Sequence, residues 1–138
     1  MEPQVVQFAA DGSSKWAGMG DYTLTSPDQL HRVALTYEGE PPHGDSYHRG
    51  TIDGRAFPGF IWGCMFAFSS CSRYLVFSWM PKLIERHTVV VNLQEKRYSL
   101  LPEYIYDFTV NWPTISGKGQ QASGKQFSFN GSETWLPY

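Results

Sequence analysis

The sequence lacks the features that define several classes of protein. It contains only two cysteines, Cys64 and Cys71, which are too few for a disulfide framework, and we expect both to be reduced, buried thiols. Its 11 basic and 13 acidic residues give a formal charge of −2, so it lacks the dense basic field that nucleic-acid binding requires. The longest apolar stretch, residues 57–68, is interrupted by proline and glycine and is too short to span a membrane.

The first eight residues do not have the pattern of a secretory signal, because they carry no basic region and no sustained apolar run. Taken with the small number of cysteines, this predicts a cytoplasmic protein. We expect neither nucleic acid nor a membrane among its partners.

Motifs for catalysis and for cofactors are also lacking. The sequence contains no Gly-x-Ser-x-Gly nucleophile elbow. Residues 119–126 approach a phosphate-binding loop, but Gln126 stands where a serine or threonine must ligate magnesium. His43, Asp45 and His48 are residue types that ligate divalent cations, yet the surrounding prolines and glycine indicate a solvated loop without an evident fourth ligand. We therefore expect no cofactor and no metal.

Aromatic residues and turns are what the chain has in abundance. Aromatic side chains make up 16% of its 138 residues, and such rings suit pleated sheets and contact surfaces. No long window shows the apolar stripe of a helix. The tight-turn dipeptides are Asp11-Gly12, Asp53-Gly54 and Asn130-Gly131. This pattern predicts one all-β domain over residues 1–138.

Three hairpins are predicted, two across the dipeptides at 53–54 and 130–131 and one across a turn at residues 94–96. The β-branched run 88–93 should pair with 97–101, and residues 49–52 should form the corresponding hairpin with 55–57. The third hairpin should join 127–129 to 134–135 across Asn130-Gly131, where aromatic and polar residues alternate.

One part of the chain nearly repeats itself. Residues 26–37 reappear, one residue shorter, as residues 69–79. The corresponding strand positions are Val33, Leu35 and Tyr37 in the first copy and Leu75, Phe77 and Trp79 in the second, and Ile52 likewise corresponds to Val91. A period of roughly 40–45 residues is typical of a four-stranded propeller blade.

The repeat resembles a blade of the WD-repeat or TolB-like propellers, in which a Ser-Pro-Asp-like turn opens the inner strands. Ser26-Pro27-Asp28 and residues 69–74 carry this resemblance. The blade-like repeats would cover approximately residues 24–66 and 67–108, with a partial copy over 109–138. Two to three blades cannot close a ring. We therefore expect antiparallel blade-like sheets arranged as an incomplete propeller, as a two-sheet sandwich, or as a half-ring completed by self-association.

Tyrosines and carboxylates gather at the matching ends of the two repeats. Aromatic rings can anchor a protein partner while carboxylates steer a basic one. Tyr104 and Trp112 are placed more readily in the core than in such a face. The candidate partner-binding residues are Tyr37, Glu38, Glu40, His43, Asp45, Tyr47, Glu103, Tyr106 and Asp107.

In size, mild acidity, lack of motifs and blade-like repeats, the chain resembles the immunity proteins that accompany bacterial toxins of contact-dependent or type VI secretion systems. The resemblance implies a non-catalytic protein whose acidic loop, residues 38–47, covers the active site of a cognate toxin. Two alternatives stay open. One is a hydrolase with a site of dispersed Asp, Glu and His, which requires a deep pocket of converging titratable groups. The other is a scaffold that completes a propeller by self-association, for example as a homodimer.

Overall fold

The protein is all-β, as its composition predicts. The computed structural model describes residues 3–42, 44–82, 85–120 and 122–138, and within these ranges it contains strands, turns and no helix. In chain order the strands are β1 (Gln4–Gln7), β2 (Lys15–Trp16), β3 (Tyr22–Thr25), β4 (Arg32–Gly39), β5 (Tyr47–Ile52), β6 (Arg55–Ala56), β7 (Phe60–Phe68), β8 (Tyr74–Met80), β9 (His87–Asn92), β10 (Arg97–Leu100), β11 (Phe108–Asn111), β12 (Thr114–Gly117), β13 (Gln126–Ser128) and β14 (Leu136–Pro137).

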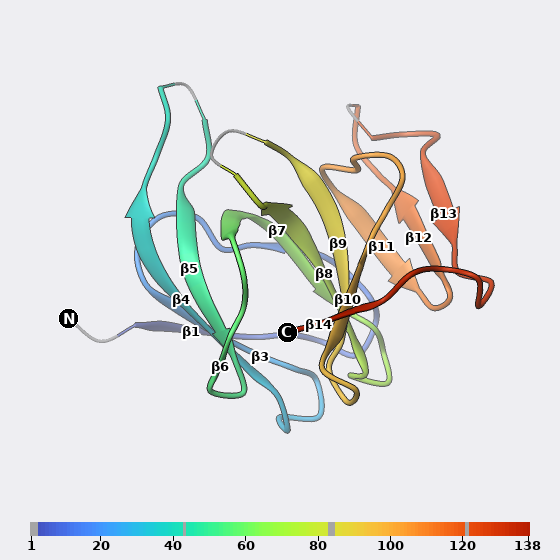
Figure 1. Ribbon diagram of the computed structural model, residues 1–138, viewed down its shortest axis with the longest axis horizontal. Coiled ribbons are helices and arrows are strands. Elements are labelled where there is room, and N and C mark those ends of the chain that lie inside the picture. Colours follow the sequence, from blue (N-terminus) through green and yellow to red (C-terminus); the bar gives the residue numbers. More distant parts are fainter. Residues whose placement is uncertain (1–2, 43, 83–84, 121) are drawn as a thin grey trace.

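The strands form two sheets (Figure 1). The large sheet has 11 strands in the order β1-β3-β4-β5-β7-β8-β9-β10-β14, with β2 paired to β7 and β6 paired to β5. The small sheet has the order β11-β12-β13. The pair β1–β3 is parallel and makes the large sheet mixed, whereas its other pairs are antiparallel.

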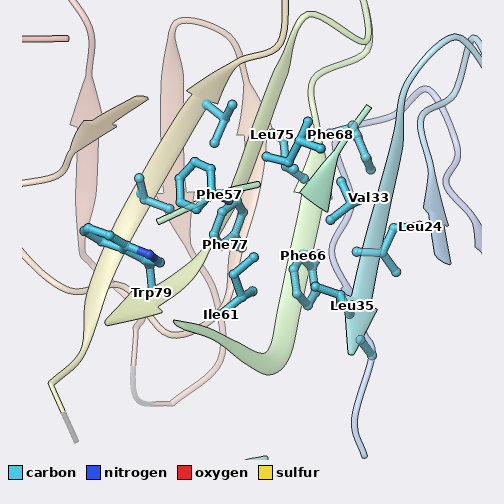
Figure 2. Packing of buried hydrophobic residues seen from close by; sticks show 14 of the residues in the cluster. Leu24, Val33, Leu35, Phe57, Ile61, Phe66, Phe68, Leu75, Phe77 and Trp79 are labelled. Carbon is cyan, nitrogen blue, oxygen red and sulfur yellow. The ribbon is translucent and has the colours of Figure 1, made fainter. Parts of the chain in front are cut away.

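The first hydrophobic core joins strands from both halves of the large sheet. Leu24 of β3 and Leu35 of β4 belong to the same buried cluster as Phe66 of β7 and Phe77 of β8 (Figure 2). Along β4 the burial alternates residue by residue, because one face of this strand packs on the core and the other faces solvent.

A second core lies between the other face of β7–β9 and the small sheet. It contains Val76 of β8 and Val90 of β9 together with Phe108 and Ile115 of the small sheet. Because both faces of β8 and β9 are covered, nearly every residue of these strands is buried. Such strands read as continuous apolar runs rather than as alternating ones.

The two Ser-rich turns that carry the propeller resemblance have the same backbone structure. The amides of Ser26 and Ser69 each donate to the carbonyl five residues later, at 3.0 and 2.8 Å. The fourth residue of each turn, Gln29 or Ser72, has a positive φ of 64° or 63°. The strands that follow, β4 and β8, lie in one sheet that is continuous through the pairing of β5 with β7. That these units are propeller blades stays a prediction.

Two of the three predicted hairpins are confirmed. Strand β9 pairs with β10, and β5 pairs with β6, across the predicted turns. The third is wrong: β13 pairs with β12, no strand follows directly after Asn130-Gly131, and the chain ends in β14 beside β10. The reason is local, since Glu133 accepts hydrogen bonds from the amides of Asn130 and Gly131. The Asn130 side chain in turn accepts from the Ser132 amide, so the backbone needs no ladder partner here.

The two cysteines lie in different environments. Cys64 is buried in β7, as predicted, but Cys71 is exposed, which corrects the prediction that both are buried. Cys71 belongs to the turn after β7, and the apolar strand ends at Phe68.

In the described part of the chain, no helix is long and apolar enough to cross a membrane.

Candidate functional site

A cleft of about 1190 Å³ opens where the β4–β5 connection meets the segments before β9, before β11 and after β12. Its lining mixes acidic, basic, aromatic and small residues, namely Glu40, Pro41, Pro42, Gly44, Asp45, Arg86, Tyr104, Tyr106, Asp107, Lys118, Gly119 and Gln120.

Four of the nine predicted partner-binding residues line this cleft. Glu40 and Asp45 come from the β4–β5 connection, and Tyr106 and Asp107 come from the segment before β11. The two sequence regions predicted to lie at matching ends of the repeats therefore face each other across one hollow. Gly39 is still part of β4 and Tyr47 begins β5, so the connecting loop is shorter than the predicted loop 38–47.

The other predicted residues that the structure describes lie outside the lining. Glu38 belongs to β4 and makes an exposed ion pair with Arg49, with 3.6 Å between Oε1 and Nε. Glu103 is exposed and pairs with Lys125 at 3.6 Å. His43 lies outside the described residues.

Two predicted tyrosines are packing residues beside the cleft. The ring of Tyr37 lies edge-on to His48, with 6.0 Å between centroids. Tyr47 lies edge-on to both Phe60 and Trp62, at 5.5 and 6.2 Å. Both tyrosines are half-buried.

Arg86 connects several segments around the cleft, although no pattern in the sequence singles it out. Its Nη2 donates to Asp45 Oδ2 at 3.0 Å and its Nη1 donates to the Tyr104 hydroxyl at 3.1 Å. The guanidinium also lies 4.0 Å from the ring centre of Trp62, which is a cation–π contact. The Trp62 Nε1 donates to the Glu85 carbonyl at 3.0 Å and so fixes the ring. Arginine suits this position because its planar group can stack and donate at the same time.

A short chain of hydroxyl groups leads from Arg86 into the protein. The Tyr104 hydroxyl is 3.0 Å from the Ser78 Oγ of β8, so this tyrosine has a polar anchor as well as a packed ring. Burial raises the pKa of Tyr104. Burial, reinforced by the negative charge of Asp45, raises the pKa of Tyr106 to about 12. Both phenols are therefore protonated at neutral pH, and the Tyr104 hydroxyl acts as a hydrogen-bonding group.

The small sheet supplies the opposite wall. Lys118 donates its amide to the Asp107 carbonyl at 3.0 Å, and the following turn is closed by the Ser123 amide on the Gly119 carbonyl at 2.9 Å. The Asp107 Oδ1 accepts from Ser14 Oγ at 2.6 Å and from the Phe108 amide at 2.8 Å. Residues 118–120, which directly follow β12, thus form a wall of the cleft.

Of the candidate cation ligands His43, Asp45 and His48, the first lies outside the described residues and the other two have different partners. His48 is fully buried, and its Nε2 lies 2.8 Å from the Gly20 carbonyl. Asp45 instead bonds to Arg86. Among the residues that the structure describes, no three His, Cys, Asp or Glu side chains gather in a way that could hold a metal ion.

The sequence held one usable signal for the residues that were missed. In the segment 103–107 the residues alternate, with Ile105 buried and Tyr104 and Tyr106 only partly so. Ile105 packs into the second core, and both tyrosines line the cleft. Arg86 has no comparable signal, because its ion-pair partner Asp45 is distant in sequence. Comparisons of the chain with protein-family models, with curated proteins and with solved structures found no match.

Proposed function

We propose that this chain is a non-catalytic protein-binding module and that a segment of its partner enters the cleft around Arg86. The observation that carries the proposal is the fixed guanidinium, held by Asp45, Tyr104 and Trp62 in an open, mixed-charge hollow. Arginine and tyrosine are the residue types that dominate binding energy at protein interfaces. Since Arg86 is already ordered, a partner loses little side-chain entropy in meeting it.

A hydrolase would use the same cleft, because its acidic and phenolic groups converge there. The chemistry of these groups favours binding. Asp45 is paired with Arg86, and the raised pKa values of Tyr104 and Tyr106 leave no phenolate to act as a base at neutral pH. Cys64 is fully buried and burial raises its pKa, whereas a nucleophilic thiol needs exposure and a lowered pKa.

In its narrower form, the proposal makes the chain a cytoplasmic immunity protein and the partner a secreted bacterial toxin. This form rests on the general character of the sequence. In such a complex, the β4–β5 loop with Glu40 and Asp45 would lie over the active site of the toxin and steer its basic groups.

The test is an affinity capture of the tagged protein from its native cytoplasm, followed by titration of the recovered partner. We compare Arg86→Ala with Arg73→Ala, because Arg73 makes a similar but exposed ion pair with Glu95 outside the cleft. We expect Arg86→Ala to weaken binding at least about tenfold and Arg73→Ala to leave it unchanged. Equal affinity of both variants, or substrate turnover without any partner, would contradict the proposal.

A further inference from the structure

Strand β1 forms an open edge of the large sheet. It stands at one end of the strand order and pairs only with β3. The amides of Gln4 and Phe8 donate to the carbonyls of Asp21 and Thr25, each at 3.1 Å. Because successive peptide groups of a strand point to opposite sides, the amides of Val5 and Gln7 point away from β3. Neither of these two amides donates to any residue that the structure describes.

The groups on this edge form a specific pattern. The outward donors are the amides of Val5 and Gln7, and the outward acceptors are the carbonyls of Pro3, Val5 and Gln7. Pro3 has no amide hydrogen. The Gln7 carbonyl already accepts from Lys15 Nζ at 2.7 Å. Two donors and two acceptors therefore remain without a protein partner among the described residues.

We propose that a second copy of this chain pairs with β1, antiparallel, about a two-fold axis at Val5. In this register each Val5 amide donates to the Val5 carbonyl of the second copy, and each Gln7 amide donates to the opposing Pro3 carbonyl. Every free donor and acceptor is then used. The Gln7 carbonyl lies opposite Pro3 of the second copy, which has no amide hydrogen to donate. This carbonyl instead accepts from Lys15 of its own chain.

The composition of the strand favours this pairing. Sheet edges are normally protected by charged side chains, proline or a bulge. Residues 4–7 read Gln-Val-Val-Gln and carry no charge, and Val5 is 69% exposed. Lys15 protects only the Gln7 end of the edge. The pairing would join two copies into one continuous sheet by strand addition. It uses no residue of the cleft, so it is independent of the proposed partner site.

The test is sedimentation equilibrium from about 10 µM to about 1 mM, because a four-residue strand predicts a weak dimer. Val5→Pro removes the outward amide but leaves the amides that face β3, and an edge tolerates proline at such a position. Val5→Thr is the matched control, because it keeps the amide and the β-branched shape. We expect the wild type and Val5→Thr to dimerise and Val5→Pro to dimerise at least about tenfold more weakly. A wild type that stays monomeric throughout, or Val5→Pro that dimerises as well, would overturn the proposal.

Residue-specific amide exchange tests the register without any substitution. On raising the concentration, exchange of the Val5 and Gln7 amides should slow, whereas the Val6 amide faces β3 and should stay as it is. A dimer in which Val5 and Gln7 exchange as fast as in the monomer would show that the copies meet elsewhere, and the proposal would be wrong.

Discussion

Strands β4 and β8 occupy equivalent places in the sequence repeat, yet their surroundings differ. Val33 of β4 pairs with Ile52, and Leu75 of β8 pairs with Val91, so corresponding positions of the two repeats pair with each other's counterparts. The outward face of β4 meets solvent, whereas the outward face of β8 is covered by the small sheet. The small sheet does more than form a second core with β8. It places Lys118 and Asp107 opposite the β4–β5 loop, and so it creates the cleft at the boundary between the covered and the bare half.

A charge placed on the outward face of β4 or of β8 should produce the largest difference in stability between the two strands. Ala34 of β4 and Val76 of β8 are equivalent outward positions, one exposed and one fully buried. Val76→Asp should lower the free energy of unfolding by at least about 3 kcal/mol, because it buries an unpaired carboxylate. Ala34→Asp should stay within about 1 kcal/mol. Urea denaturation of both variants measures the difference, and similar losses would show that the two faces are not distinct.

The ion pair of the cleft should matter more for stability than the equivalent pair on the surface. Arg86 and Asp45 are 30% and 21% exposed, and Arg86→Ala leaves Asp45 and Tyr104 without this donor. Allowing for solvent screening, we expect a loss of about 1–2 kcal/mol. Arg73 and Glu95 are 43% and 56% exposed, so Arg73→Ala should cost less than about 0.5 kcal/mol. Thermal denaturation of both variants would contradict this account if their losses were equal.

A buried histidine at the end of the bare half makes stability depend on pH. His48 is fully buried, and its Nδ1 has no hydrogen-bond partner in the described residues. Burial lowers the pKa of His48 below the usual value for histidine, about 6.5. As the pH falls, His48 therefore takes up a proton in the unfolded chain at a higher pH than in the folded one. The free energy of unfolding is unaffected by this histidine above about pH 6.5 and decreases below it.

The measurement is urea denaturation between pH 7 and pH 5, where one proton gives at most about 1.4 kcal/mol per pH unit. The carboxyls of Asp11, Asp28 and Glu133 have lowered pKa values, so their effect on stability falls mainly below this range. His48→Gln, although less stable, should lose the dependence. A wild type with constant stability over this range would show that His48 does not titrate as proposed.

The sequence predicted those parts of the fold that depend on local chemistry. The turns at 53–54 and 94–96 form the expected hairpins, because the residues on each side carry the pairing pattern. The hairpin predicted across Asn130-Gly131 is wrong, because the short polar side chains that allow a hairpin also allow a turn closed by its own hydrogen bonds. Among the residues that line the cleft, the acids and Tyr106 are predicted partner-binding residues, whereas Arg86 is not. Its contacts with Asp45 and Trp62 depend on tertiary packing that no spacing in the sequence encodes.

The smallest expected effect concerns two acidic residues of the predicted loop 38–47. Glu40 lines the cleft, whereas Glu38 lies on β4 and pairs with Arg49 outside it. If the partner enters the cleft, Glu40→Ala should weaken its binding about three- to tenfold and Glu38→Ala should not change it. Titration of the captured partner gives both values. A larger effect at Glu38 would move the binding surface to the open face of β4.

Amide exchange of the free protein and of its complex tests the central claim most directly. Binding in the cleft predicts slower exchange over residues 44–46, 104–107 and 118–120, with no change at Ala34 and Thr36 on the bare face of β4. Protection over the bare face, with the cleft exchanging as fast as before, would contradict the account.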